Sequence, residues 1–438
     1  MKKLLLLLTF CPLLLWAQMN PIVFEEYDLA NGLHVILHED HSTPIVAVSV
    51  SYHVGSKNED PSRTGFAHFF EHLLFEGSEN IGRGEYMKLV QDNGGVLNAN
   101  TSFDRTFYYE ILPSNQLELG LWMESERMLH AKIDQEGVNT QREVVKEELR
   151  ERNENTPYGS RMNEVFEHAF ESHPYRWTPG GSPEYINQAN LSEFMEFYKT
   201  FYVPNNACIS IAGDISLSQS KEWIEKYFGT IPRGTSAVPR PTVVEPEKFA
   251  EVRDTVYDNI QLPAVVQAYH GPAQGTEDAY AVEMMSMILS QGNSSRLQKN
   301  VVDKQQKAVY AGAFPMPTED PGLLLMFGIA NMGTEVLALE DAMNVEVSRM
   351  SEELISIEEF EKLRNQIEND FISGNTSMAG IAESLSDYYL YYNGETNLVN
   401  TELERYFNVT REAILEVAKK YLRPSNRVTL HYLPKTEK

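Results

Sequence analysis

The sequence predicts an α+β protein made of two homologous halves, and three observations lead to this prediction. Strand-like segments alternate with helical segments along the chain. Short motifs of the first half recur in the second half, in the same order, at a nearly constant offset of about 215–220 residues. Between the halves, residues 231–250 contain four prolines, at 232, 239, 241 and 246, among few apolar side chains, which is typical of a linker.

The first seventeen residues have the pattern of a secretory signal peptide. Two lysines precede an apolar run from Leu4 to Trp16, and Ala17 follows as a small residue at the expected cleavage site. The run is too short to span a bilayer comfortably and is interrupted by Pro12. We therefore expect an exported, periplasmic protein with no stable membrane anchor, in which residues 1–17 are removed.

Composition narrows the classes of partner and of metal site. The 63 acidic side chains outnumber the 37 basic ones and give a net charge of −26, which argues against binding to nucleic acids or anionic membranes. Of the two cysteines, Cys11 lies in the signal and Cys208 in an apolar strand, so we expect neither a disulfide nor a cysteine metal site. A chain of 438 residues is long enough to build a large core in two or more domains.

The first half begins with a predicted hairpin, because Asn31-Gly32 separates two β-rich segments. The histidines at 34, 38 and 41 are interpreted as surface residues of this hairpin and its loop. The later segments are a strand at 45–52, helices at 67–75 and 85–91, a long strand at 98–112, helices at 115–129, 136–152 and 192–202, a strand at 207–212 and a helix at 221–228.

The helix over residues 67–75 carries a candidate metal motif. At about 100° per residue, His68, Glu71 and His72 fall within one sector of the helix, and mostly phenylalanine and leucine cover the rest. Burying three convergent polar groups is costly unless something binds them. Two histidines at i and i+4 suit a divalent metal, most often zinc, and the order His-x-x-Glu-His is the inverted form of the commoner zinc-protease motif. In the alternative interpretation, both histidines are ordinary core residues.

A third ligand is expected from the helix over residues 136–152. With Val144 as the reference, Val145 lies at about 100° and Glu148 at about 40°, whereas Glu147 lies at about 300° on the polar side. Glu148 is therefore the carboxylate that is predicted to point inward, where it needs a cation or a donor. It would complete three protein ligands and leave the fourth position for water. The alternative is a solvated glutamate in an acidic helix.

The second half repeats three features of the first half but not its metal motif. Pro44-Ile45-Val46 recurs as Pro263-Ala264-Val265, the glycine that ends a helix at 77 recurs at 292, and the asparagine before a strand at 206 recurs at 426. With the glycines matched, the three motif residues correspond to Glu283, Ser286 and Met287. We predict a zinc-binding catalytic half at 18–230 and a degenerate repeat at 251–438 that grips substrate or closes a cavity.

The combination resembles the pitrilysin family of inverted-motif zinc peptidases, which includes insulin-degrading enzymes and mitochondrial processing peptidases. The resemblance rests on His68-x-x-Glu71-His72, on Glu148 lying 76 residues after His72, and on the duplicated halves. It covers nearly everything after the signal, and the segments 93–99, 173–175 and 294–297 also fit it. In such a fold each half is a mainly antiparallel sheet backed by helices.

The resemblance implies that His68, His72 and Glu148 hold Zn²⁺. It also implies that Glu71 is the general base for attack of the metal-activated water on a peptide carbonyl. We therefore expect a zinc metalloendopeptidase, a hydrolase that acts on peptides or unfolded polypeptide segments. In the family, substrate adds as a further strand to an edge that begins at the position of Asn98 and Ala99. The other interpretation of Asn98 is a turn residue after the glycines.

Two departures from the family pattern concern Gln141 and Asp303. Gln141 stands where many relatives carry a glutamate, and we expect its amide to hydrogen-bond a ligand and tune the site. Self-sufficient relatives carry an arginine and a tyrosine seven residues apart that contact substrate. Tyr310 matches the tyrosine, but Asp303 stands at the arginine position, so the alternative is that Tyr310 is only a strand residue.

From this missing arginine we expect the zinc-bearing member of a two-chain peptidase. It would form a homodimer, or a heterodimer with a related chain that supplies the Arg/Tyr pair. The alternative is a non-catalytic peptide-binding or assembly subunit on the same scaffold.

Overall fold

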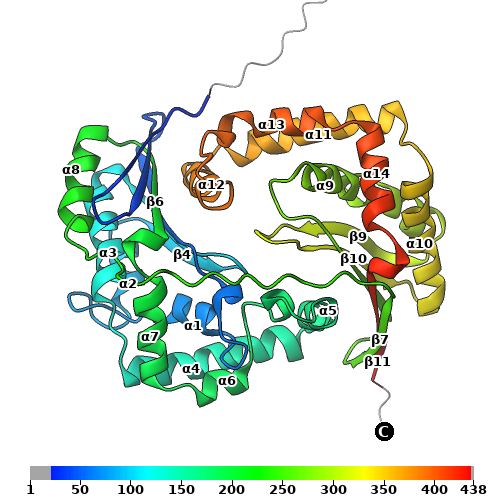
Figure 1. Ribbon diagram of the computed structural model, residues 1–438, viewed down its shortest axis with the longest axis horizontal. Helices are drawn as coiled ribbons and strands as arrows, with labels where there is room; N and C mark the ends of the chain where they lie inside the picture. The colour runs from blue at the N-terminus through cyan, green and yellow to red at the C-terminus, as the bar shows by residue number, and fades with distance from the viewer. Residues whose placement is uncertain (1–20, 436–438) are drawn as a thin grey trace, which may run out of the picture.

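Two β-sheets, one in each half of the chain, form the framework of a computed structural model that describes residues 21–435 (Figure 1). The predicted signal peptide, residues 1–17, lies outside the described residues. The strands of the first sheet are β1 (Glu25–Asp28), β2 (His34–Glu39), β3 (Ile45–Tyr52), β4 (Val96–Thr101), β5 (Thr106–Pro113) and β6 (Ala207–Gly213). Those of the second are β7 (Val252–Asp258), β8 (Ala264–His270), β9 (Ala308–Met316), β10 (Leu323–Ala330) and β11 (Arg427–Pro434).

Apart from the additional outer strand β1 of the first sheet, the two sheets share one topology. Their orders are β1-β2-β6-β3-β5-β4 and β7-β11-β8-β10-β9. In each half the last strand lies between two early strands: β6 is parallel to β2 and antiparallel to β3, and β11 is parallel to β7 and antiparallel to β8. The other pairs are antiparallel. This confirms the predicted α+β fold of two homologous, mainly antiparallel halves.

Helices cover both sheets. Those before the linker are α1 (Phe66–Leu73), α2 (Glu85–Asp92), α3 (Leu117–His130), α4 (Gln135–Arg150), α5 (Arg161–Ala169), α6 (Pro183–Gln188), α7 (Leu191–Phe201) and α8 (Leu217–Phe228). Those after it are α9 (Glu277–Ser290), α10 (Val336–Glu352), α11 (Ile357–Gly374), α12 (Met378–Tyr391), α13 (Leu398–Asn408) and α14 (Arg411–Tyr421). None of the helices in the described part of the chain is long and apolar enough to cross a membrane.

The long strand predicted at 98–112 is instead a hairpin of β4 and β5. The backbone N–H groups of Asp104 and Arg105 donate to the hydroxyl oxygen of Ser102, at 3.2 and 3.0 Å. A serine that binds the backbone two and three residues ahead stabilises a turn, and hydrophobic periodicity does not reveal it.

One face of each sheet packs on helices of its own half. In the first sheet, Val35, Leu37 and Val48 join a buried cluster with side chains of α1, α3 and α7. In the second sheet, Val265 and Tyr269 join a cluster with α9, α10 and α14. Successive side chains of a strand point to opposite faces, so the neighbouring residues need a different cover.

That cover comes from the other half of the chain. The helix α12 packs on β3 and β6, where Leu385 lies in a cluster with Ile36 and Ala47. The helix α5 packs on β8 and β11, where Phe166 lies in a cluster with Val266. Figure 1 shows α12, in orange, on the side of the first sheet, and α5 reaching toward the second. The two halves therefore interlock through exchanged helices.

Two of the three hairpin histidines are buried, contrary to their predicted surface position, and the exchanged helix α12 covers one of them. The His34 ring stacks on Tyr389 of α12, with ring centroids 3.6 Å apart. His38 is buried beside the carbonyl of Val23, 2.8 Å from its Nδ1. His41 is exposed, as predicted.

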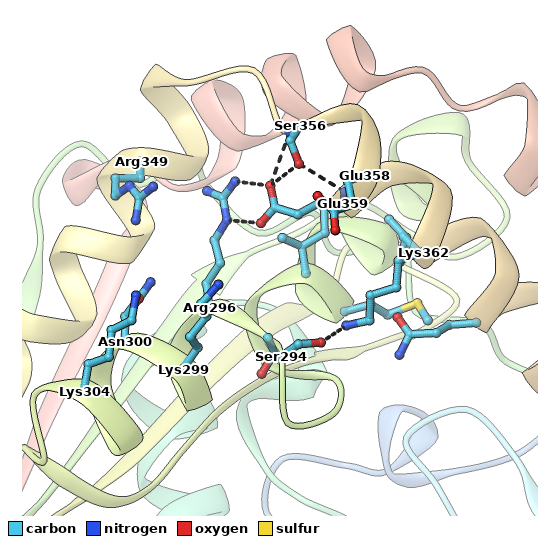
Figure 2. A pocket seen from close by; sticks show the side chains of 15 residues that line it. Ser294, Arg296, Lys299, Asn300, Lys304, Arg349, Ser356, Glu358, Glu359 and Lys362 are labelled. Atoms are coloured by element: carbon cyan, nitrogen blue, oxygen red, sulfur yellow. Dashed lines mark hydrogen bonds and ion pairs between the residues drawn. The ribbon is translucent and has the colours of Figure 1, made fainter.

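The chain between the halves, residues 231–250, contains neither helix nor strand. Beyond it, a cavity of about 390 Å³ opens in the second half. The helical segment Leu297–Lys304, the end of α10 and the beginning of α11 surround this cavity (Figure 2).

Candidate metal centre

The helix α1 is fixed at its N-terminus and packed along its length. Glu59 accepts hydrogen bonds from the backbone N–H groups of Gly65 and Ala67, at 2.9 and 2.7 Å. These bonds satisfy two N–H groups at the start of the helix, while burial raises the pKa of Glu59 to about 8. Phe66 and Phe69 both stack on Phe194 of α7, with centroids 4.6 Å apart. The polar side of α1 is therefore held in one orientation.

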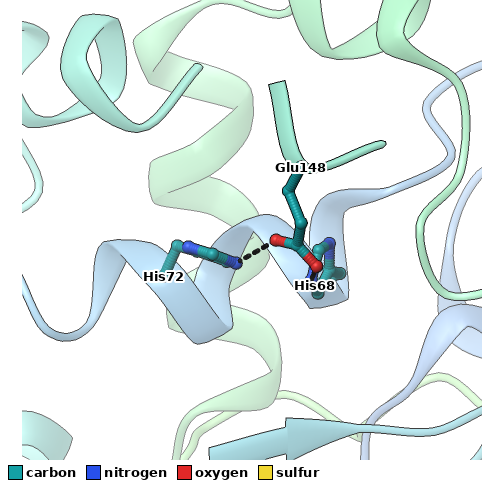
Figure 3. A group of neighbouring side chains, drawn as sticks. All are labelled: His68, His72 and Glu148. Atoms are coloured by element: carbon teal, nitrogen blue, oxygen red, sulfur yellow. Dashed lines mark ion pairs between the residues drawn. The ribbon is translucent and has the colours of Figure 1, made fainter. Parts of the chain in front are cut away.

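The structure brings His68 and His72 of α1 together with Glu148 of α4 (Figure 3). Glu148 Oε2 lies 3.0 Å from His72 Nε2, and Glu148 Oε1 lies 3.5 Å from His68 Nε2. One nitrogen or oxygen from each residue lies within 4.8 Å of the other two. The three predicted ligands thus converge from two helices that are distant in sequence.

The helix phase that led to Glu148 was only partly right. Val144, which served as the inward reference, is 45% exposed, whereas Val145 and Leu149 are buried. Glu148 lies at the border of this buried face, with 36% of its side chain exposed. It reaches the histidines from that border, while Glu147 pairs with Arg150 on the exposed side.

The donor set fits a zinc ion. Two imidazole nitrogens and one carboxylate oxygen are the ligands of catalytic zinc sites, which keep a fourth position open. A tetrahedral ion with bonds of about 2.0–2.1 Å places its ligand atoms about 3.4 Å apart. The distances of 3.0 and 3.5 Å from Glu148 to the two histidines agree with that spacing.

The two histidines also keep Glu148 ionised. Hydrogen bonds from His68 and then from His72 hold the pKa of Glu148 well below its usual range, although partial burial acts in the opposite direction. Arg152 adds a positive charge, with Nη1 3.8 Å from Glu148 Oε1. The site therefore presents a charged carboxylate, which is the form that binds a metal.

Glu71 lies between the two histidines in sequence, and a residue of the outer strand β4 hydrogen-bonds its carboxylate. The hydroxyl of Thr101, the last residue of β4, donates to Glu71 Oε2 at 2.7 Å. Glu71 Oε1 forms no hydrogen bond within residues 21–435. One oxygen of this carboxylate is thus positioned, and the other is available to accept a proton.

Gln141 does not make the hydrogen bond that we predicted for it. Its amide donates to Glu76 Oε1 at 2.5 Å, and not to His68, His72 or Glu148. Glu76 is buried just after α1 and also binds Arg83. The amide therefore bridges α4 to the end of α1, and any effect on the candidate metal centre is indirect.

The residues predicted to bind substrate lie on the outer strands of the two sheets. Asn98 and Ala99 belong to β4, which pairs with β5 on one side and is an outer strand of the first sheet. Tyr310 belongs to β9, the outer strand of the second sheet, and is 46% exposed. Asp303 is exposed and accepts a hydrogen bond from Gln298. No hydrogen bond or ion pair among the described residues joins Tyr310 or Asp303 to the three candidate ligands.

Sequence reasoning missed Thr101 and Glu76. Thr101 is 30 residues from Glu71, and their contact depends on how β4 docks against α1. The bond between Glu76 and Gln141 likewise depends on the packing of α1 against α4. No local spacing in a single sequence signals either contact.

The corresponding helix of the second half has no such centre. Glu283 of α9, the counterpart of His68, accepts a hydrogen bond at 2.5 Å from the hydroxyl of Tyr406. Ser286 donates to the carbonyl of Glu283 within the same helix. This helix has the position of α1 but uses its polar residues in hydrogen bonds.

Two family models match the chain, one in each half. Residues 34–178 match the model described as insulinase, peptidase family M16. Residues 188–367 match the model described as the peptidase M16 inactive domain. The first match contains all three candidate ligands, and the second contains the helix that lacks them.

Known proteins resemble the chain over most of its length. It is 31% identical over 414 residues to the zinc protease PqqE of Helicobacter pylori, an alignment that covers 94% of this chain and 93% of that protein. It is 24% identical over 414 residues to a probable mitochondrial-processing peptidase subunit beta of Arabidopsis thaliana, covering 90% and 75%. The crystal structure of a protease from Helicobacter pylori superposes with a TM-score of 0.91 at 29% identity, covering 95% of this chain and all of that one.

Proposed function

The chain belongs to peptidase family M16, and from this membership we propose that it is an exported zinc metalloendopeptidase that hydrolyses peptides or unfolded polypeptide segments. The observation that carries the proposal is the convergence of His68, His72 and Glu148 beside Glu71. Relatives that are named zinc proteases support the choice of metal.

His68, His72 and Glu148 would hold the zinc ion. When bound, zinc supplies a water of lowered pKa and polarises the carbonyl of the scissile peptide bond. Glu148 contributes a negative charge that partly balances the ion, and the low pKa of its carboxyl group keeps it ready to bind over a wide pH range.

Glu71 would move the proton. Its Oε1 accepts a proton from the attacking water and later gives it to the nitrogen of the leaving amine. Thr101 holds Oε2 of the same carboxylate and so limits its rotation. General base catalysis of this kind contributes about 10²–10⁴-fold to the rate.

The position of Thr101 also indicates where a peptide would lie. This residue ends β4, an outer strand of the first sheet that packs against α1. A substrate segment added to that edge as a strand would pass Asn98 and Ala99 and approach Glu71. Binding through backbone hydrogen bonds requires an extended segment, which favours peptides and unfolded chains over folded proteins.

We further propose that the active form contains two chains. The exposed Asp303, in place of an arginine that would contact substrate, supports a partner that supplies the Arg/Tyr pair. The relative from Arabidopsis thaliana is itself named as a subunit. Asp303 and the match of the second half to the inactive domain also favour a second candidate function, a non-catalytic peptide-binding subunit.

Substitution of Glu71 separates these functions. We expect Glu71→Gln to retain zinc, measured by elemental analysis, and to lose at least about 100-fold of the cleavage of quenched fluorescent peptides. The matched control is Glu196→Gln, on the exposed side of α7, which should keep full activity. Assays run with and without candidate partner chains, together with light scattering, determine whether cleavage requires two chains.

Three results would decide against parts of this proposal. Zinc binding without cleavage in every combination of chains would favour the peptide-binding subunit. Unchanged cleavage by Glu71→Gln would exclude the assigned base. Full activity of a monomer would exclude the requirement for a partner.

A further inference from the structure

The cavity in the second half is positively charged, although the chain as a whole is strongly negative. Five cationic side chains and two carboxylates line it, in a protein whose net charge is −26. The cations come from three separate elements: the segment Leu297–Lys304 with the residue before it, the end of α10 and the beginning of α11. They are Arg296, Lys299, Lys304, Arg349 and Lys362.

Arg296 is the buried centre of this group and has one nitrogen without a partner. Its Nε and Nη2 donate to the two carboxylate oxygens of Glu359, at 3.0 and 3.1 Å. Its Nη1 is buried and has no hydrogen-bond partner among residues 21–435, and only 7% of the residue is exposed. Figure 2 shows the guanidinium with one side on Glu359 and the other facing Arg349 across the cavity.

Ser295 supplies a second polar group in the same state. Its hydroxyl is buried and has no hydrogen-bond partner in the described chain, and only 3% of the residue is exposed. An unpaired buried donor is costly, and such groups in native structures commonly mark a bound ion, water or ligand. Two adjacent residues of one lining segment therefore lack partners.

The three lysines around the cavity are not neutralised by carboxylates. Lys362 donates to the hydroxyl of Ser294 at 2.5 Å, and Lys304 donates to the side-chain oxygen of Asn300 at 3.2 Å. Lys299 forms no ion pair within residues 21–435. Acidic residues outnumber basic ones in this chain, yet no carboxylate in the described part of it pairs with these three ammonium groups.

Of the two carboxylates that line the cavity, Glu359 is engaged by Arg296, and the exposed Glu358 forms no ion pair within residues 21–435. The Glu359 carboxylate accepts hydrogen bonds from Arg296 and, at 3.2 Å, from the backbone N–H of Ser356, the N-cap residue of α11. Arg349 lies 3.4 Å from Glu346 and 3.5 Å from Glu353, both longer than a strong charge-assisted hydrogen bond. The cavity thus keeps an excess of positive charge and several unused donors.

We propose that this cavity binds a multivalent phosphate oxyanion, either free or as the phosphoryl group of a small molecule. A single carboxylate carries one charge and would not occupy donors that come from three elements. A phosphate group carries up to two charges and three acceptor oxygens, and lysine and arginine together are its usual ligands in proteins. A volume of about 390 Å³ also exceeds the size of one carboxylate group.

Calorimetric titration of the full mature chain tests this proposal without any peptidase assay. The probes are inorganic phosphate, pyrophosphate and a sugar monophosphate, at constant ionic strength set with chloride. We expect saturable binding of at least one of them. We expect Lys299→Gln to weaken the binding of that probe about tenfold, because the substitution removes one charge-assisted contact.

The matched control is Lys199→Gln, an exposed lysine of α7 that also forms no ion pair in the described chain. It should bind the probe as tightly as the wild type does. Tighter binding of pyrophosphate would identify a free oligophosphate, and tighter binding of the sugar monophosphate a phosphorylated small molecule.

The proposal is overturned if none of the probes binds, if acetate or citrate binds equally well, or if both lysine variants weaken binding alike. Lys299 is exposed on the helical segment Leu297–Lys304, so we expect Lys299→Gln to fold as the wild type does. Circular dichroism checks the fold of the variant. The outcome is independent of zinc binding and of cleavage, which concern the other half of the chain.

Discussion

At the scale of single residues, the candidate metal centre depends on Glu148, which extends from α4 to the two histidines of α1. The sequence alone predicted that His68, Glu71 and His72 share one side of a helix, because residues three and four apart are neighbours on a helix surface. Glu148 was harder to select, since Val144 is exposed and the real inward face carries Val145 and Leu149. Thr101 could not be found at all, because its bond to Glu71 arises only when a strand docks on a helix.

We predict that Glu148→Gln weakens zinc binding by more than the roughly 10–100-fold that the loss of an outer-sphere partner costs. The amide keeps the size of the side chain but removes the charge that faces the two histidines. Competition with a chromogenic zinc chelator measures the affinity.

The neighbouring substitution Glu147→Gln is the control, because Glu147 pairs with Arg150 on the exposed side of the same helix. It should leave the affinity unchanged. A loss of zinc from Glu147→Gln alone would mean that the wrong carboxylate has been assigned.

At the scale of elements, the sequence predicted the order of strands and helices along the chain better than it predicted which elements pack against one another. In the first half, periodicity located α3, α4, β3 and β6 within a few residues. It merged β4 and β5 into one strand, since a serine turn lacks glycine or proline. It also gave no sign that α12 covers the first sheet, because the apolar face with Ile381, Ala382 and Leu385 does not specify which sheet it will contact.

We predict that Leu385→Ala, in α12, lowers the free energy of unfolding by about 2–5 kcal/mol, as for other buried leucines. The missing side chain leaves a cavity against Ile36 and Ala47 of the first sheet. Hydrogen exchange should therefore accelerate in β3 and β6, although the substitution is in the other half.

Ile372→Ala in the neighbouring helix α11 is the matched control, because Ile372 is 38% exposed. It should change stability by only about 0.5 kcal/mol. Faster exchange confined to residues 251–435 in Leu385→Ala would contradict the described packing.

At the scale of the whole molecule, the halves are joined by ion pairs as well as by exchanged helices. Lys57 of the first half is buried and lies 2.9 Å from Asp104 in its own half. It also lies 2.6 Å from Glu319 and 3.1 Å from Asp320 of the second half. His53 adds a contact of 3.0 Å to Glu319. The repeated motifs predicted two similar halves, but no repeat can predict how the halves face each other, because that contact is made by residues that differ between them.

We predict that acid weakens this contact through Glu319. Burial alone would raise its pKa, but the hydrogen bond from His53 and the charge of Lys57 lower it from 4.5 to about 2. The folded state therefore favours the ionised form, so the pair stabilises the protein above about pH 4.5, and this contribution disappears as the pH falls toward 2.

Urea unfolding of Glu319→Gln checks this expectation. At pH 6 the variant should be less stable than the wild type by about 1–3 kcal/mol, between the values for exposed and buried pairs. The difference should shrink steadily between pH 4.5 and pH 3. Glu412→Gln, which changes an exposed glutamate of α14, should match the wild type throughout. A difference that stays constant with pH would show that Glu319 acts by packing rather than by charge.

The exchange of α5 and α12 has a consequence for synthesis. When a ribosome has produced the first 230 residues, the face of the first sheet around Ile36, Ala47 and Cys208 has no cover, because residues 378–391 do not yet exist. A nascent chain with a bare apolar sheet face is prone to aggregate. Its maturation must wait for nearly the entire polypeptide, and a chaperone that shields this face during that interval would raise the yield of native protein.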